Sequence, residues 1–204
     1  IVMKKLKITA VIVTRKNSRR VKNKNTRLFH NKDSLLSLKI KQLKKIKEIN
    51  EIIVGSDDPK AELIANNLKV RFFKRKKVFC DERSKSANDM IKNMLGYFTS
   101  DYVIWTHCTN PFINEKVISS AIKKFFRNKN FFFDSLFCVD KLRGHFYSQK
   151  TVPINHNPRS KNHKTAMSLQ YLIKDNGSIF IRKFDHMKKD GNFIGKNPMV
   201  LETD

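Results

Sequence analysis

The sequence is poor in cysteine and has no long apolar run. Its three cysteines, Cys80, Cys108 and Cys138, lie about thirty residues apart and form no CxxC pair. This spacing fits neither a zinc-binding pattern nor a disulfide framework, and it indicates a reducing compartment. The longest apolar stretch, residues 131–139, is interrupted by Asp134 and is too short to span a bilayer. Early lysines break any signal-peptide pattern, so we expect a cytoplasmic protein without membrane contacts.

Acidic residues are also scarce. The 204 residues include 43 Lys and Arg but only 18 Asp and Glu, which gives a formal net charge of +25. A charge of this size suggests nucleic-acid binding. However, lysine greatly outnumbers arginine, and the basic residues are spread along the whole chain. This distribution favours a bias of composition over a nucleic-acid surface, so nucleic-acid binding is kept as a minor hypothesis.

Hydrophobic patterning predicts alternating strands and helices. The apolar run Ile8–Val13 is typical of a strand buried on both faces. Further strands are predicted at 51–54, 70–73, 102–106, 135–139, 178–182 and 200–201, with a turn at 175–177, and helices at 35–46, 61–68, 88–98 and 115–126. This order predicts a single α/β domain over residues 1–204, with a mainly parallel sheet and helices on both faces.

Residues 141–170 differ from the rest of the chain. They are polar, rich in histidine and asparagine, and without clear periodicity. We interpret them as an excursion from the sheet that forms either an active-site flap or a dimer arm. The histidines His145, His156 and His163 have no metal-ligand spacing. The phenylalanines at 125–126 and 131–133 lie apart from the cations, so we interpret them as core or interface residues.

The most informative stretch is the loop that follows the first strand. Cations and small polar residues are dense there: Arg15, Ser18, Arg19, Lys22, Lys24 and Asn25. Open α/β sheets bind anionic ligands where a buried strand ends in such a loop. Cationic side chains and backbone amides can there surround a phosphate chain. The alternative is a solvated basic turn after an ordinary strand.

Five short motifs occur in an order that resembles one known family. Residues 14–25, TRKNSRRVKNKN, match A-R-x-G-S-K-x-(I/V)-x-x-K-N in length and at most key positions. Residues 55–58, GSDD, correspond to S-(S/T)-D-D, and residues 106–112, THCTNPF, to L-Q-P-T-S-P-L. Residues 153–158, PINHNP, and 176–181, NGSIFI, resemble later blocks. The chain thus resembles the cytidylyltransferases that activate nonulosonic acids, namely the CMP-sialic acid (acylneuraminate) synthetases and their pseudaminate, legionaminate and KDO relatives.

The resemblance implies a fold and an activity. The fold would be a Rossmann-like sheet of the nucleotide-diphospho-sugar transferase type. The enzyme would transfer CMP from CTP to the anomeric hydroxyl of a nonulosonic acid of the sialic, legionaminic or pseudaminic type, and release pyrophosphate. Mg²⁺ as cofactor, a homodimer and a role in cell-surface polysaccharide biosynthesis are implied as well.

The resemblance also implies roles for individual residues. Arg15 and Lys24 match the family's functional cations and would be the catalytic residues. An arginine can fork two hydrogen bonds onto phosphate oxygens, whereas a lysine acts as a mobile point charge. The implied nucleotide-binding residues are Arg15, Ser18, Lys24, Asn25 and Arg75, of which Asn25 and Arg75 match cytosine contacts. The implied substrate-binding residues are His107, Thr109 and Asn110.

The residues themselves leave alternatives open. Arg15 and Lys24 could be solvated surface charges, and Asn25 could be a turn residue. The carboxylates at 57–58 could serve only to cap the following helix. His107 could hydrogen-bond a sugar hydroxyl or carboxylate, or it could be a packed histidine at a strand end.

The chain departs from the family's motifs at several positions. Asn17 replaces a glycine, and His107 and Cys108 stand where the family has glutamine and proline. The family's metal-binding D-x-D pair would follow shortly after residues 202–204, so we expect the C-terminal end to be truncated relative to the family, and the metal ligands are unknown. A catalytically drifted nucleotide-binding relative is therefore an alternative function.

Overall fold

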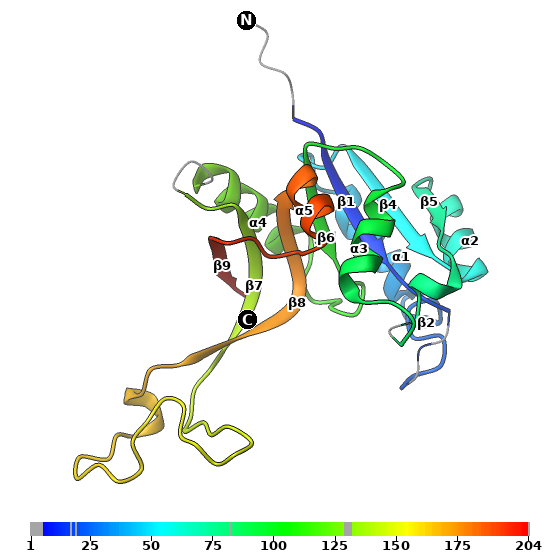
Figure 1. Cartoon of the computed structure of the whole chain (residues 1–204). Coiled ribbons are helices and arrows are strands. Elements are labelled where there is room, and N and C mark those ends of the chain that lie inside the picture. The colour runs from blue at the N-terminus through cyan, green and yellow to red at the C-terminus, as the bar shows by residue number, and fades with distance from the viewer. Residues whose placement is uncertain (1–5, 17, 19, 82, 129–131, 204) are drawn as a thin grey trace, which may run out of the picture.

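The computed structural model describes residues 6–16, 18, 20–81, 83–128 and 132–203. Within these residues the chain forms a central sheet of seven strands (Figure 1): β1 (Ile8–Val13), β4 (Glu51–Ser56), β5 (Arg71–Lys74), β6 (Tyr102–Thr106), β7 (Ser135–Leu142), β8 (Leu172–Lys183) and β9 (Pro198–Glu202). Their order is β5-β4-β1-β6-β8-β7-β9. Strand β8 pairs antiparallel with β6 and β7, and the other pairs are parallel. The predicted α/β fold with a mainly parallel sheet is confirmed.

Helices cover both faces of the sheet. Helices α1 (Leu35–Lys44), α2 (Pro59–Asn67) and α4 (Glu115–Asn128) pack on one face, and α3 (Ala87–Leu95) and α5 (Phe184–Asp190) pack on the other. Successive residues of β1 serve the two layers, because Ala10 and Ile12 belong to one cluster of buried side chains and Val11 to the other. The prediction that this strand is buried on both faces is therefore confirmed.

Helices α1 and α2 begin where polar side chains accept hydrogen bonds from free backbone N–H groups. Ser34 accepts from the Ser37 amide at 3.0 Å at the start of α1, and Asp58 accepts from the Lys60 amide at 3.0 Å at the start of α2. Each such cap contributes about 1 kcal/mol to helix stability. The capping role considered for Asp58 is confirmed. No described helix has the length and apolar character needed to cross a membrane.

Several local features differ from the predictions. A two-stranded sheet of β2 (Leu28–His30) and β3 (Asp33–Ser34), the helix α5, and the 3-10 helices η1 (Lys77–Phe79) and η2 (Ala166–Ser168) were not predicted. The predicted turn at 175–177 is wrong, because these residues lie inside β8. There the pairing with β7 shifts between Phe137 and Val139, which pair with Phe180 and Asp175. Extra residues on one strand make a bulge, and Gly177 adopts the left-handed φ of 67° within it.

The phenylalanine predictions are partly confirmed. Phe125 is buried and Phe126 packs against the same cluster. The core interpretation is wrong for Phe132 and Phe133, which are 89% and 36% exposed. Phe131 lies outside the described residues.

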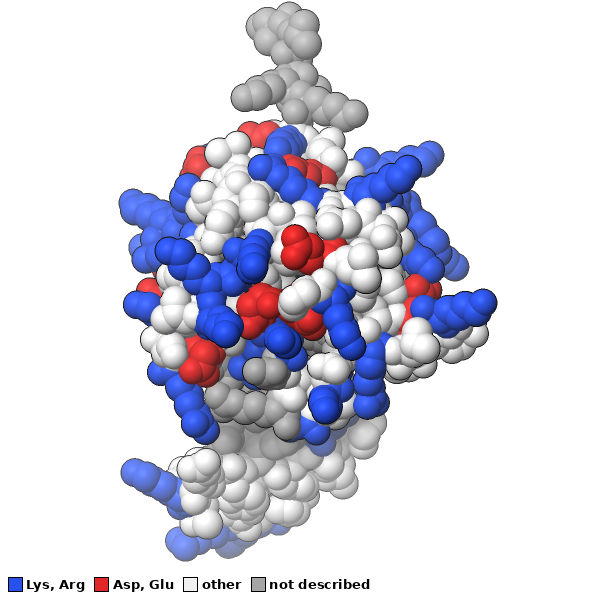
Figure 2. Space-filling view, turned by 90° about the vertical axis from the view of Figure 1, so that its right-hand side faces the viewer, with Lys and Arg blue, Asp and Glu red and all other residues white. Residues whose placement is uncertain are grey.

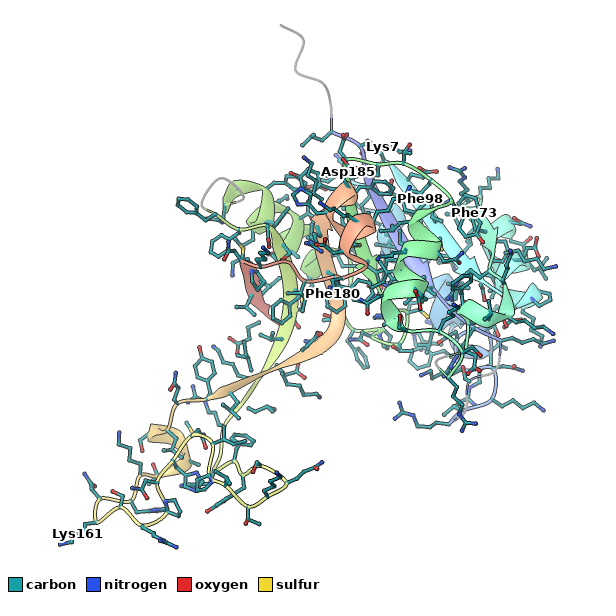
Figure 3. The ribbon with its side chains drawn as sticks, viewed as in Figure 1. Lys7, Phe73, Phe98, Lys161, Phe180 and Asp185 are labelled. Atoms are coloured by element: carbon teal, nitrogen blue, oxygen red, sulfur yellow. The ribbon has the colours of Figure 1, made fainter. Side chains whose placement is uncertain are left out.

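Residues 143–171 form an arm between β7 and β8. The ends of both strands extend from the sheet, and the arm projects away from the body of the molecule (Figure 1). Lys161 lies at the far end of the arm, whereas Phe180 lies on the part of β8 that belongs to the sheet (Figure 3). Inside the arm, the Asn155 side chain donates to the backbone oxygens of Gly144 and Gln170 at 2.8 and 3.0 Å.

Candidate active site

A cavity of about 750 Å³ opens where β1 ends. Its wall is formed by the basic loop, by the segment between Arg75 and Met90, and by the residue that follows β6. Six of the eight residues predicted for the site line it: Arg15, Ser18, Lys24, Asn25, Arg75 and His107. The carboxyl ends of neighbouring parallel strands meet at one edge of a sheet, which is why segments so distant in sequence converge here.

The basic loop is tied to the junction between β4 and α2. The Thr14 amide donates to the Gly55 oxygen at 3.0 Å, and the Lys16 amide donates to Asp57 Oδ1 at 2.8 Å. Near the end of the loop, the Thr26 hydroxyl donates to Asp58 Oδ2 at 3.3 Å. The GSDD motif therefore anchors the loop, and both of its carboxylates have structural partners.

Three buried polar atoms at the cavity lack a hydrogen-bond partner among the described residues. They are Thr14 Oγ1, Asn25 Oδ1 and Arg75 Nε. The residues are only 4%, 9% and 4% exposed. An unsatisfied buried polar group costs about 1–3 kcal/mol, so groups of this kind gathered around one cavity indicate a polar ligand. Asn25 does serve the turn, since its backbone oxygen accepts from the Leu36 amide, but its side chain lines the cavity.

Arg75 supports the floor of the cavity. Its guanidinium donates to the backbone oxygens of Thr14, at 3.3 Å, and of Phe79. Burial lowers its pKa, and no carboxylate of the described residues forms an ion pair with it. The packing requires a glycine at position 55, because a Cβ there would lie 2.4 Å from Met94 Sδ and 3.0 Å from Arg75 Cδ. A buried cation without a counter-ion favours an anionic or strongly polar ligand.

Arg15 and Lys24 lie on the cavity wall and are half-buried, so neither is a fully solvated surface charge. Arg15 Nη1 lies 3.5 Å from the Cys80 oxygen, at the far limit of a hydrogen bond. Lys24 follows Asn23, which has a left-handed φ of 52° and whose backbone oxygen accepts from the Thr26 and Arg27 amides. Half-buried cations in a cavity interact with anions more strongly than cations in bulk water do.

His107 joins the cavity from the end of β6. Burial lowers its pKa, the charge of Asp175 opposes this effect, and the charge of Lys24 adds to it. The ring is therefore neutral at pH 7 and can both donate and accept a hydrogen bond. The ring also lies edge-on to the Phe180 ring, with centroids 6.4 Å apart. His107 is therefore packed against Phe180 and also lines the cavity.

Thr109 and Asn110 lie outside the cavity lining. Thr109 is exposed, and Asn110 Nδ2 donates to the Asn176 oxygen in the β8 bulge at 3.2 Å. The structure thus brings His107 to the basic loop, whereas the side chain of Asn110 contacts β8. A contact of these two residues with a sugar stays a prediction.

Sequence reasoning missed one wall of the cavity. Phe79 and Cys80, together with Ser86, Ala87 and Met90 at the start of α3, line the cavity along with the basic loop. The signal was a capping box, because Ser86 accepts from the Asp89 amide and the Asp89 side chain accepts in return. The positive end of a helix dipole on this wall favours negative charge in the cavity.

The described residues do not supply an evident metal centre. They contain no group of three or more His, Cys, Asp and Glu side chains arranged to hold a metal ion. The carboxylates nearest the basic loop, Asp57 and Asp58, are engaged by the Lys16 amide and by the start of α2. The cavity therefore has cations on its wall but no evident set of ligands for a metal ion within the described part of the chain.

A second hollow of about 740 Å³ lies between α1 and α4. Its lysines are exposed, and two of them pair with glutamates, Lys45 with Glu115 at 3.0 Å and Lys123 with Glu48 at 3.9 Å. None of the unpartnered buried polar atoms of the described residues lines it. On the face shown in Figure 2, Lys and Arg side chains are scattered around acidic ones and form no single stripe. This distribution does not favour a nucleic-acid interface.

The comparisons with known proteins agree with this geometry. A family model described as Cytidylyltransferase matches residues 9–194. The chain is 23% identical over 202 residues to a Helicobacter pylori protein, "Pseudaminic acid cytidylyltransferase and UDP-2,4-diacetamido-2,4,6-trideoxy-beta-L-altropyranose hydrolase". The match covers 97% of this chain and 38% of that protein, so the chain spans well under half of its curated relative.

Solved structures show the same fold. A CMP:2-keto-3-deoxy-manno-octonic acid synthetase complexed with CTP has a TM-score of 0.68 at 12% identity, over 97% of this chain and 90% of that one. The 4-diphosphocytidyl-2C-methyl-D-erythritol synthase of Anaerococcus prevotii has a TM-score of 0.65 at 12% identity, over 98% and 88%. A cytidylyltransferase of Leptospira borgpetersenii has a TM-score of 0.57 at 19% identity, over 90% and 63%. The predicted nucleotidyltransferase type of α/β fold is confirmed.

Proposed function

Since the chain belongs to the cytidylyltransferase family, we propose that it transfers CMP from CTP to the anomeric hydroxyl of a nonulosonic acid and releases pyrophosphate. The observation that carries the proposal is the cavity at the end of β1, where cations lie beside buried polar atoms that lack partners. The motifs at 14–25 and 55–58 support the family's reaction. The relatives that act on pseudaminic acid and on 2-keto-3-deoxy-manno-octonic acid support an acidic sugar as the acceptor.

The phosphate chain would lie along the basic loop. In the reaction the sugar hydroxyl gives up its proton to solvent and attacks the α-phosphorus, the bond to the bridging oxygen breaks, and pyrophosphate leaves with that electron pair. Negative charge grows on the leaving group, so positioned cations do most of the catalysis. Arg15 would form a two-pronged contact with phosphate oxygens, and Lys24 would neutralise the pyrophosphate. Ser18 would add a neutral donor.

The unpartnered atoms suit the edge of cytosine. Asn25 Oδ1 would accept from the exocyclic amine, and Arg75 Nε would donate to an acceptor on the ring. Uridine offers a carbonyl where cytidine offers the amine. A site that leaves buried polar groups unpaired with the wrong base discriminates strongly. We therefore expect CTP to be preferred over UTP and ATP.

The acidic sugar would bind on the His107 side of the cavity. A neutral imidazole can bind a hydroxyl or a carboxylate, and the surrounding cations give the pocket a positive potential. Thr109 and Asn110 are proposed neighbours of the sugar.

Mg²⁺ is proposed to accompany CTP, and the roles proposed for Arg15, Lys24 and Ser18 do not depend on it. A reducing, cytoplasmic location is proposed because CTP and free thiols belong to that compartment.

A homodimer is proposed from the arm. It exposes apolar side chains, with Tyr147, Val152, Ile154 and Met167 each at least 50% exposed. Apolar surface of this kind commonly marks a protein contact. Sedimentation or light scattering would measure the mass, and a monomer at micromolar concentration would contradict the dimer without affecting the proposed reaction.

The test is pyrophosphate release with CTP and Mg²⁺ against pseudaminic, legionaminic, sialic and 2-keto-3-deoxy-manno-octonic acids. We expect release with one acid and little with ATP or UTP. Binding of CTP without release would favour a drifted nucleotide-binding relative. Absence of CTP binding, together with salt-sensitive binding to nucleic acid, would overturn the proposal in favour of the second hypothesis.

A further inference from the structure

Helix α1 contains a lysine that is wholly buried. Lys39 is 0% exposed and ranks among the largest fully buried side chains of the protein, beside Leu36, Ile40 and Leu43. Its ammonium donates to the backbone oxygen of Asn110 at 3.1 Å and to that of Ile113. A lysine at a core position of an amphipathic helix is unusual, because burial strongly disfavours the charge.

A second side chain of α1 holds the same turn. Gln42 Nε2 donates to the Pro111 oxygen at 2.9 Å. Together, Lys39 and Gln42 bind three backbone oxygens of residues 110–113 from beneath. This turn begins three residues after His107, which lines the candidate active site, and it contains Asn110 and adjoins Thr109. The Asn110 side chain in turn donates to the Asn176 oxygen of the β8 bulge.

No carboxylate of the described residues forms an ion pair with Lys39. Two titratable groups face it. Glu115, at the start of α4, pairs with Lys45 at 3.0 Å. Cys108, in the segment after β6, remains a neutral thiol, because burial raises its pKa to about 12. The ammonium is therefore in direct contact with carbonyl dipoles of the turn, and Glu115, which is paired with Lys45, is the carboxylate whose charge reaches it.

We propose that Lys39 is a positioning residue for the acidic sugar: it fixes the turn at 110–113 and gives the adjoining His107–Asn110 segment a positive potential. The inference rests on the proposed function, since it assigns the acidic substrate to this segment. An uncompensated buried cation attracts a carboxylate at a distance, because water does not screen it. The phosphates of CTP lie against other cations, Arg15 and Lys24, so the effect is selective for the sugar.

The charge of Lys39 is lost at mildly alkaline pH. Burial lowers its pKa to about 8, while the negative charge of Glu115 opposes this effect. The neutral amine keeps two N–H donors for the turn, so deprotonation removes mainly the potential. The apparent affinity for the sugar acid should therefore fall as the pH rises through about 8, and the turn should keep its shape.

The first experiment compares Lys39→Met and Lys39→Gln with Lys44→Met. Lys44 lies on the exposed side of the same helix and is the matched control. We expect KM for the sugar acid to rise about tenfold in both Lys39 variants, while KM for CTP stays within about twofold. Equal changes in both KM values, or none, would overturn the proposal, because a merely structural role does not separate the two substrates.

The pH profile of the unchanged protein tests the charge without a mutation. KM for the sugar acid should rise between about pH 7 and about pH 9, and the rise should be absent in Lys39→Gln. The same rise in Lys39→Gln would assign the titration to another group and overturn the role of the charge. The pH profile remains a valid test even if Lys39→Met fails to fold.

A third measurement does not depend on turnover. Hydrogen–deuterium exchange of residues 108–113 should increase in Lys39→Met and remain unchanged in Lys44→Met. If the parent binds CTP but no acid reacts, the proposed function fails while this result still decides whether Lys39 holds the turn. Unchanged exchange in Lys39→Met would overturn the positioning role whatever the reaction.

Discussion

The basic loop of the body and the arm are both rich in lysine and arginine, but the fold treats them differently. In the body, the loop is anchored by Asp57 and Asp58, and its cations surround buried polar atoms without partners. The arm has no acidic residue between Lys141 and Lys174. Its cations at 150, 159, 161 and 164 are exposed, and its interior is organised by Asn155 and by histidines. Packing thus removes part of the positive charge of the loop from water, whereas these cations of the arm stay in water.

The histidines of the arm form a cluster. The ring centroids of His145 and His163 lie 5.1 Å apart with nearly parallel planes, and that of His156 lies 4.7 Å from His145. His156 Nε2 lies 2.9 Å from the Tyr147 hydroxyl. The arm thus depends on histidine rings in contact, whereas the body loop is anchored by carboxylates. The two regions should respond differently to mutation and to pH.

The largest expected effect comes from removing a cation of the basic loop, and removing a cation of the arm provides the contrast. Arg15→Ala should lower kcat/KM for CTP about 100-fold, because a donor aimed at developing phosphate charge is lost. Lys161→Ala, at the end of the arm, should change it by less than about twofold. Steady-state rates of pyrophosphate release measure both. A fall of only a few-fold in Arg15→Ala would show that the phosphates bind elsewhere.

A smaller loss is expected from the unpartnered amide. Asn25→Ala should weaken CTP binding about tenfold and reduce the preference for CTP over UTP, because the acceptor for the base is removed. Calorimetric titration with both nucleotides measures this change. Asn155→Ala in the arm is the contrasting variant, and it should leave nucleotide binding unchanged. An unaltered CTP preference in Asn25→Ala would remove Asn25 from the base contact.

The next effect in size is an indirect one, from a substitution of Gly55 beside Arg75 at the floor of the cavity. Gly55→Ala should weaken CTP binding several-fold, because the added Cβ would lie 2.4 Å from Met94 Sδ and displace Arg75 or α3. Met94→Ala in the same background should restore part of the affinity by making room. If the double variant binds no better than Gly55→Ala, the clash does not act through Met94.

The smallest expected effect concerns the pH response of the arm. Burial and the charges of His145 and His163 lower the pKa of His156 below its ordinary value of 6.5. The folded arm therefore takes up fewer protons than the unfolded arm, so its stability falls as the pH drops below that value. Limited proteolysis within 143–171 should become a few-fold faster at about pH 5.5 than at about pH 7.5.

The body provides the internal reference for this experiment, since its basic loop at 14–25 contains no histidine. His156→Gln should reduce the pH dependence of cleavage in the arm. A pH response that is equal in the arm and the body, or unchanged in His156→Gln, would rule out the histidine cluster as its cause.

Much of the fold could be predicted because local sequence patterns indicate the individual helices and strands. The run Ile8–Val13, the turn signal at Asp58-Pro59 and the apolar spacing of 115–126 are each sufficient for one element. The bulge at 175–177 could not be predicted, because Asp-Asn-Gly is a strong turn signal and only pairing on both sides keeps it in a strand. The core alternative failed for Phe132 for a related reason, since hydrophobicity alone does not reveal which side of a loop faces water.

The candidate site, like the fold, depends partly on local sequence and partly on tertiary packing. The sequence by itself determined the α/β alternation, the basic loop after β1 and the motifs at 14–25 and 106–112, because these depend on neighbours along the chain. Only the tertiary structure decided that Arg75 and His107 meet Asn25 at one cavity, that α3 provides its other wall, and that Lys39 lies under the 110–113 turn. These features depend on burial and on contacts between distant segments. Both are properties of the packed chain, and a single stretch of sequence does not determine them.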